Sequence, residues 1–445
     1  MLWAMRHPVR LVPLLYLIAI TFGTLLLWLP ISTEGEAGAT FTTALFTAVS
    51  AVAVTGLIVE DTPVYWSMFG QCSVLFLIQI GGLGTKTAAT FFALVLGRNV
   101  VFRRTVERDI EREQLSLSDA RSAIKLILIV TVIVETVTTA ILTYRFHTLY
   151  EMPLGSAFWH GLFQAISAFN NAGFSTFSDS LMGFNSDALV LLPITFAVII
   201  GSLGFPVIQD MITCGRKTSD WTLHSRITLY GTLILLGAGF ILIFATEYSN
   251  PDTLGPMGFG SRVLNAFTHS AMPRTAGFNS LDVSVFRDET VLVNYVLMFI
   301  GGGSAGTAGG IKITTVTILF VILVYQVRGM GDAEMKGRQI SNRLASQAVT
   351  VIMFALSTIF LASFYLLART DFAFEDILFE TISAFATVGL SRGLTGDLPV
   401  DGKLVLVALM FIGRVGTITA ATWLAMGAVG RGSPLRSDPK DPIIG

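Results

Sequence analysis

Four short motifs along the chain place a phenylalanine ten residues before a glycine that is followed by Leu or Phe. Consecutive glycines of these motifs lie 104 to 117 residues apart, and spacing this regular indicates repeated structural units. Glycine accepts left-handed backbone angles, which allow successive carbonyl oxygens to face one side and replace the water shell of an ion. Backbone coordination of a cation is therefore the chemistry that the motifs favour. Each motif ends in a three-residue segment, and together these are Val54, Thr55, Gly56; Asn171, Ala172, Gly173; Thr275, Ala276, Gly277; and Thr387, Val388, Gly389.

A second segment that stands out is a glycine-rich stretch near the middle of an apolar run of more than 30 residues. Glycine costs about 1 kcal/mol per residue relative to alanine in a helix, so this stretch predicts a break in the helix. It is followed by Ile311-Lys312-Ile313 rather than Gly-Lys-Ser/Thr, so it does not match a phosphate-binding loop. We refer to it as the glycine loop, and its residues are Gly301, Gly302, Gly303, Ser304, Ala305, Gly306, Thr307, Ala308, Gly309 and Gly310.

Three basic residues fall inside apolar runs: Lys86, Lys312 and Arg414. Charges within a membrane usually face a cavity or a partner, and Arg414 lies close to the middle of its run. Glu135 and Asp210 are candidate counter-charges for it. For the two lysines a second interpretation is equally good: their side chains extend out of the apolar region to the cytoplasmic interface.

The composition indicates a polytopic membrane protein. Mean hydropathy is +0.70, 53% of the residues are hydrophobic and only 13% are charged. Of the 29 Lys and Arg residues, 19 fall in five segments: 1–10, 97–125, 214–226, 327–345 and 430–445. The positive-inside rule therefore predicts that both termini are cytoplasmic. The sequence contains no nucleophile–base constellation, metal-binding spacing or cofactor motif, so we expect neither an enzyme nor a bound cofactor, and no nucleic-acid partner.

Each motif belongs to a larger unit with a constant layout. An apolar helix of spanning length comes first, followed by a polar linker and an amphipathic stretch of about three turns that ends near the glycine. At 1.5 Å per residue this stretch covers about 18 Å, too little to cross a core of about 30 Å, so it should enter the membrane and turn back. A second apolar run completes the unit. The four units span approximately 11–96, 122–213, 222–326 and 345–428.

These units predict an all-α polytopic membrane protein. Residues 1–445 should form a single transmembrane pore domain of four tandem helix–pore-helix–helix units around one pseudo-fourfold pore, with 429–445 as a cytoplasmic tail. Irregular backbone survives at membrane depth only where protein or water surrounds it, and a central pore meets that condition.

With these motifs the chain resembles the Ktr/Trk/HKT superfamily of potassium transporters. One spanning helix precedes Gly56, which is similar to the KtrB-like membrane subunits of Ktr uptake systems. The resemblance implies a selectivity filter that binds K+ at one glycine of each unit, and a gate formed by the glycine loop with Arg414 in the ion path. It also implies a homodimer in membrane lipid and a KtrA-like ring of nucleotide-binding regulatory subunits docked on the cytoplasmic face.

The function expected from these features is potassium-selective ion translocation across the plasma membrane. A sodium or weakly selective cation pathway on the same fold is one alternative. A secondary transporter of an organic solute is another, although it should show inverted repeats and a midplane pocket. Coupling to sodium or proton gradients is left open by the sequence.

Overall fold

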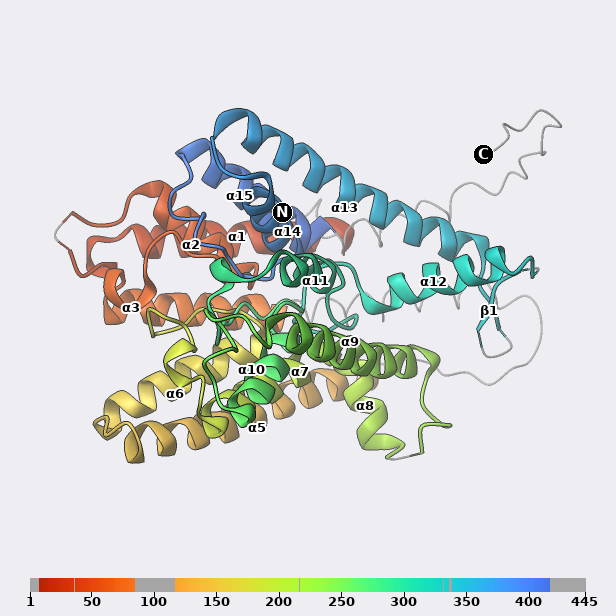
Figure 1. Cartoon of the computed structure of the whole chain (residues 1–445), viewed down its shortest axis with the longest axis horizontal. Coiled ribbons are helices and arrows are strands. Elements are labelled where there is room, and N and C mark those ends of the chain that lie inside the picture. Colours follow the sequence, from red (N-terminus) through yellow and green to blue (C-terminus); the bar gives the residue numbers. More distant parts are fainter. Residues whose placement is uncertain are drawn as a thin grey trace.

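The computed structural model describes residues 8–35, 37–84, 117–215, 217–330, 332–335 and 338–416. Within them the chain is mostly helical, and Figure 1 shows the helices gathered around a set of central loops. The expected ends of the first and fourth units, 85–96 and 417–428, and the expected tail 429–445 lie outside the described residues.

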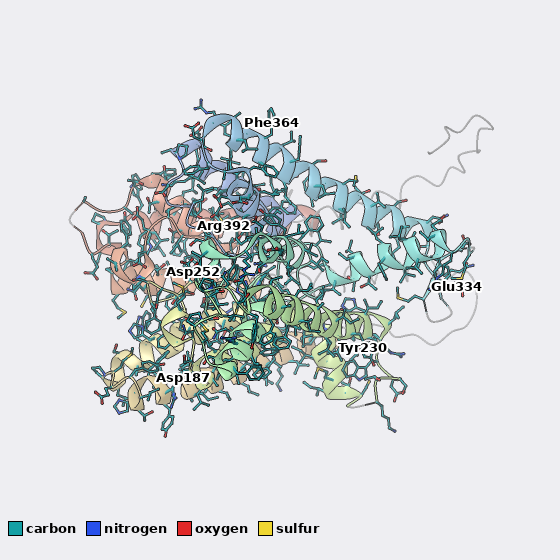
Figure 2. All side chains as sticks on the ribbon, in the orientation of Figure 1. Asp187, Tyr230, Asp252, Glu334, Phe364 and Arg392 are labelled. Atoms are coloured by element: carbon teal, nitrogen blue, oxygen red, sulfur yellow. The ribbon has the colours of Figure 1, made fainter. Side chains whose placement is uncertain are left out.

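Each unit begins with a long helix close to its predicted position. Three helices in the described part of the chain, spanning Ser122–Thr148, Leu223–Glu247 and Leu344–Arg369, are long and apolar enough to cross a membrane. Large apolar side chains such as Phe364 lie on the outer surface, as expected for contact with lipid (Figure 2). The four opening helices are α1 (Pro8–Trp28), α5 (Leu117–Thr148), α9 (Leu223–Glu247) and α13 (Asn342–Arg369).

A short helix precedes each of the four glycines, and its bounds lie within three residues of the stretches that the sequence predicts, 41–52, 157–169, 261–272 and 374–385. Ser and Thr side chains on these helices, such as Thr47, Ser50 and Thr381, are buried. The first is capped by Thr40, whose side chain accepts a hydrogen bond from the amide of Thr43. We call them the pore helices, and they are α2 (Phe41–Val52), α6 (Leu154–Asn170), α10 (Phe259–Ala271) and α14 (Phe374–Ala386).

The second apolar run of each unit is more irregular than the first. In the first unit a helix covers Met68–Gly84. In the third unit α11 (Asp288–Phe299) and α12 (Ile313–Val327) flank the glycine loop, so the predicted break is confirmed. In the fourth unit α15 (Val400–Phe411) continues into a π-helical turn, Ile412–Gly416, which contains Arg414.

In the second unit the sequence predicts one continuous run over 187–213, whereas the structure bends it. Helices α7 (Ala188–Leu203) and α8 (Phe205–Thr213) meet at an angle of 95°. The joint is Gly204, whose φ is +89°, and Pro206 lies in the first turn of α8. A proline at a helix start and a glycine before it are the local signals of a helix boundary.

Short elements complete the described chain. They are η2 (Pro30–Ser32), α3 (Thr62–Tyr65), η3 (Met182–Phe184), η4 (Val283–Val285) and the antiparallel strand pair β1 (Glu334–Met335) and β2 (Arg338–Gln339).

Packing between units follows one pattern. The second helix of one unit contacts the pore helix of the next: α7 contacts α10, α11 contacts α14, and α15 returns to α2. The helix over Met68–Gly84 is joined to α6 by hydrogen bonds from Trp159 Nε1 to Gln71 Oε1 (3.1 Å) and from Asn170 Nδ2 to Gln79 Oε1 (2.6 Å). The contacts therefore run from each unit to the next and close on the first.

We expect Gly204→Ala to destabilise the protein. Its φ of +89° and ψ of 147° are close to a region that essentially only glycine adopts, where strain costs about 1–3 kcal/mol, and an added Cβ would also strike the carbonyl oxygen of Ser304. Gly237→Ala in α9 is the matched control, because an added Cβ there meets nothing within 4 Å. Thermal unfolding of the purified proteins in detergent measures the difference. Equal melting temperatures for the two variants would contradict the strain argument.

Candidate functional site

The four motif glycines lie next to one another in a closed ring. A Cβ atom built on Gly56 would lie 3.0 Å from the Cα of Gly173, and one on Gly173 would lie 2.9 Å from the Cα of Gly277. The corresponding distance is 3.2 Å from Gly277 to Gly389 and 3.0 Å from Gly389 back to Gly56. Segments more than 100 residues apart in sequence therefore meet at one point, and no larger residue fits there without displacing its neighbour. We call these four residues the glycine ring.

The backbone repeats the same unusual conformation in all four segments. The ring glycines have φ values of +93°, +72°, +75° and +94°. The residue two positions earlier is also left-handed in each unit, with φ of 55° at Val54, 59° at Asn171, 69° at Thr275 and 51° at Thr387. Positive φ is uncommon outside glycine and is a strained conformation for β-branched residues such as valine. Alternating the backbone hand in this way allows successive carbonyl groups to face the same side.

Serine side chains hold these turns against their pore helices. The Ser50 hydroxyl accepts a hydrogen bond from the amide of Gly56 (3.1 Å) and donates to the carbonyl of Leu57 (2.7 Å). Ser383 accepts from the amide of Gly389 in the same way (3.2 Å). Sequence reasoning assigned no role to these serines, although their constant offset of six residues before the glycine was visible.

The other two units vary this arrangement. Ser167 donates to the carbonyl of Phe174 at 2.7 Å. In the third unit alanine occupies the corresponding position, and the amide of Gly277 donates to the carbonyl of Met272 instead (3.3 Å).

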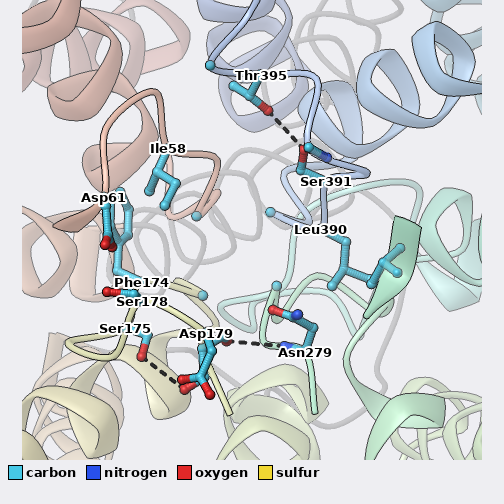
Figure 3. A pocket seen from close by; sticks show the side chains of 18 of the residues that line it. Ile58, Asp61, Phe174, Ser175, Ser178, Asp179, Asn279, Leu390, Ser391 and Thr395 are labelled. Atoms are coloured by element: carbon cyan, nitrogen blue, oxygen red, sulfur yellow. Dashed lines mark hydrogen bonds between the residues drawn. The ribbon is translucent and has the colours of Figure 1, made fainter. Parts of the chain in front are cut away.

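A cavity of about 460 Å³ opens on one side of the ring and is lined by all four glycines. Figure 3 shows that side chains from all four units surround it, among them Asp61, Asp179 and Asn279. Among the described residues, four carboxylic residues line the cavity, and Arg392, the one basic residue among them in its lining, pairs with Asp376 (2.9 Å). An excess of carboxylates raises the local concentration of cations. The sequence analysis did not single out the acidic lining, which consists of Glu60, Asp61, Asp179 and Asp282.

The glycine loop touches the backbone and side chains of the turns that carry the ring. The amide of Gly309 donates to Thr275 Oγ1 (3.1 Å), and the Thr307 hydroxyl donates to Asn171 Oδ1 (2.8 Å). An added Cβ on Gly309 would strike the Thr387 hydroxyl, so the loop also approaches the fourth unit closely. The sequence predicted both sets of residues, and the structure brings them into contact.

The bend between α7 and α8 supplies backbone partners for the loop. The amide of Gly303 donates to the carbonyl of Ser202 (2.8 Å), and the amide of Thr307 donates to that of Gly201 (3.1 Å). A Cβ added to Gly303 would collide with the carbonyl of Leu203, so the two chains need glycine at this approach.

Two of the three predicted intramembrane cations bind the glycine loop. Arg414 Nη1 donates to the carbonyl of Thr307, and Lys312 Nζ donates to the carbonyls of Ala308 and Gly309. Lys86 lies outside the described residues. The carbonyls of the loop therefore bind the side chains of both Arg414 and Lys312.

The proposed counter-charges have other partners. Glu135 accepts hydrogen bonds from Gln79 Nε2 (3.1 Å) and Asn170 Nδ2 (3.3 Å). Asp210 accepts from the amide and hydroxyl of Thr222 at the start of α9 (3.0 and 2.8 Å).

Two buried ionisable residues near the ring were not identified from the sequence. Arg274 is 1% exposed and lies just after the end of α10. The partial negative charge at the C-terminal end of the helix stabilises a positive charge there. Glu380 is fully buried in α14. Among the described residues no cluster of three or more His, Cys, Asp or Glu is arranged to hold a metal ion.

Known proteins resemble the chain over almost its whole length. It is 37% identical over 417 residues to Ktr system potassium uptake protein B of Bacillus subtilis (strain 168), covering 94% of this chain and 93% of the relative. It is 36% identical over 429 residues to the potassium/sodium uptake protein NtpJ of Enterococcus hirae, covering 95% and 93%. The fold matches the crystal structure of the potassium transporter TrkH from Vibrio parahaemolyticus with a TM-score of 0.73 at 18% identity, over 94% of this chain and 85% of that one.

Residues 9–427 match the TrkH family, whose description is cation transport protein. The extent of this match and the identity to the relatives show that the chain belongs to the TrkH family of cation transport proteins.

Proposed function

We propose that the chain is the pore-forming subunit of a Ktr-type system for potassium uptake across the plasma membrane. In this proposal one domain of four pseudo-fourfold units surrounds a single pore, and the glycine ring with the two residues before each glycine is the selectivity filter. The observation that carries the proposal is the closed ring, in which four segments share the same pair of positive φ values. Potassium is the transported ion, and the chain acts as a transporter rather than an enzyme.

Three physical features support passage of a cation through the ring. Backbone carbonyls in the alternating conformation offer oxygens that replace the hydration shell of an ion. The pore helices end beside the ring, with Val52 four residues before Gly56, and helix C-termini carry a partial negative charge. Carboxylates lining the adjoining cavity attract cations before they enter.

The glycine loop and Arg414 are proposed as the gate. The loop lies against the turns of the filter, and its carbonyls hold the cationic groups of Arg414 and Lys312. A fixed charge 4 Å from a passing cation costs about 4 kcal/mol at an effective dielectric constant of 20, and water reduces this value. An opening motion that withdraws the loop would move two barriers together: the loop itself and the positively charged side chain bound to it.

The assembly is proposed from the kinship with Ktr membrane subunits. We infer a homodimer with one pore per protomer, cytoplasmic termini and a KtrA-like regulatory ring on the cytoplasmic face. The names of the Ktr relatives, which describe parts of a system, support a partner protein.

A sodium-conducting or weakly selective pathway is the second candidate. The name of the NtpJ relative includes both potassium and sodium, and this favours the candidate specifically. The same ring would serve, with less discrimination between the two ions.

We expect serine at Gly56 or Gly277 to reduce the preference for potassium over sodium. A side chain at these positive φ positions displaces the adjacent backbone of the ring, and each 1.4 kcal/mol of lost coordination lowers selectivity about tenfold. Uptake of both ions in cells that lack their own potassium systems measures the ratio. Gly155→Ser, where an added Cβ meets nothing within 4 Å, should behave like the parent protein. Unchanged ratios in both ring variants would remove the glycines from the filter.

We expect Arg414→Gln to raise potassium flux while leaving the potassium-to-sodium ratio unchanged. The substitution removes a positive charge from the loop but leaves the ring backbone intact. Flux into vesicles, normalised to the amount of purified protein, provides the measurement. If Arg414 serves to hold the loop in place instead, losing a buried charged contact can cost about 3–5 kcal/mol and folded protein should decrease. Normal yield with unchanged or lower flux would exclude an electrostatic barrier.

A further inference from the structure

The second and fourth units share a side-chain brace between the pore helix and the segment that follows the ring. The brace joins the residue nine positions before the glycine to the residue two positions after it. In the fourth unit the Ser391 hydroxyl donates to Glu380 Oε1. In the second unit Gln164 Nε2 donates to Ser175 Oγ at 2.6 Å. The same two offsets therefore carry a carboxylate–serine pair in one unit and an amide–serine pair in the other.

Each brace continues into the backbone of the following segment. Ser391 Oγ accepts a hydrogen bond from the amide two residues later, that of Gly393 (2.9 Å). Ser175 Oγ likewise accepts from the amide two residues later, that of Phe177 (3.0 Å). Thr395 adds a further bond in the fourth unit, from its hydroxyl to Glu380 Oε2 (3.0 Å). The serine thus connects a buried pore-helix side chain to the chain that leaves the ring.

A second pair of contacts lies one helical turn farther from the ring. It joins the residue thirteen positions before the glycine to the residue three positions after it. Arg392 Nε lies 2.9 Å from Asp376 Oδ1 in the fourth unit. His160 Nδ1 lies 2.7 Å from Thr176 Oγ1 in the second unit. Two contacts at matching offsets therefore fix the same two segments in both units.

The first and third units are built differently at these four offsets. In the first unit Ile58 and Val59 follow the glycine, and their side chains cannot form hydrogen bonds. In the third unit Leu264 occupies the outer position on the pore helix. The inner positions hold Thr268, which accepts from Thr195 Oγ1 (3.3 Å), and Asn279, whose Nδ2 donates to the carbonyl of Leu281 (3.3 Å).

The braces are buried, and they support two turns on opposite sides of the ring. Glu380 and Gln164 are fully buried, and a hydrogen bond in a low-dielectric environment is stronger than one in water. The glycines of the braced units, Gly173 and Gly389, are both neighbours of Gly56 and of Gly277. The braced turns therefore face each other across the ring, with an unbraced turn on either side.

We propose that Glu380 and Gln164 are positioning residues that fix two opposite turns of the ring and so set its selectivity among monovalent cations. The turns of the first and third units lack this support and adjust to the ion. This inference rests on the proposed function, because it assigns the ring the task of discriminating between cations.

The test compares variants that remove or retain the brace. Glu380→Leu and Gln164→Leu keep a side chain of similar size without hydrogen-bonding groups. Glu380→Gln gives the fourth unit a glutamine, which is the residue that makes the brace in the second unit. Thr47→Val is the matched control, because Thr47 occupies the same offset in the first unit, where Ile58 cannot accept or donate. The concentration dependence of potassium and sodium uptake is measured for each, normalised to the protein present in the membrane.

Both leucine variants should lower the potassium-to-sodium ratio about tenfold and raise the KM for potassium, whereas a lost packing contact alone would reduce protein amount. Glu380→Gln should keep the ratio within about twofold of the parent, and Thr47→Val should leave it unchanged. If Glu380→Leu fails to reach the membrane, Ser391→Ala removes the same bond from a partly exposed position and should produce the same loss.

The inference is overturned if Glu380→Leu and Gln164→Leu keep the parental ratio at normal protein amounts, or if Thr47→Val lowers the ratio as much as they do. Failure of the proposed function looks different, because the parent itself would then not prefer potassium over sodium. The two leucine variants should even so shift whatever cation ratio the parent has.

Discussion

Backbone groups that leave a helix inside a membrane must bond to protein or face water, and this constraint governs the centre of the molecule. Four turns, the glycine loop and the bend between α7 and α8 all interrupt helices. They satisfy one another: the loop amides of Gly303 and Thr307 bond to carbonyls exposed by the bend, and the amide of Gly309 bonds to Thr275 of the third turn. The irregular segments therefore form one connected structure, and the long helices around them separate it from lipid.

The sequence was sufficient for the features that arise from local chemistry. Long apolar runs fix the opening helices, and the repeated glycines locate the four turns, because only such residues tolerate positive φ at close approach. The dense glycines at 301–310 likewise predict the break between α11 and α12, because each glycine makes the helical conformation less favourable than alanine would. Each of these conclusions depends on residues within one short segment.

Features that depend on a distant partner were not predictable in the same way. The bend at Gly204 has a local signal in Pro206, but the loop that bonds to its backbone comes from the third unit. Glu380 and Arg274 were not identified from the sequence, because their partners follow the ring or lie on another helix. The acidic residues around the cavity come from the segments that follow three of the four ring glycines. Only the folded chain therefore shows them as one group.

The contacts of the glycine loop limit how a gate at this position can work. Its carbonyls bind the charged groups of Lys312 and Arg414, and Thr307 bonds at once to Arg414 through its carbonyl and to Asn171 through its hydroxyl. Withdrawing the loop breaks its bond to the second turn of the ring in the same motion that moves the arginine. That turn is one of the two held by a brace, so the proposed filter would keep its shape when its contact with the loop is lost. In the proposed function, support from the pore helix and release of the loop act on the same turn, which would allow the gate to open directly beneath the filter without unfolding it.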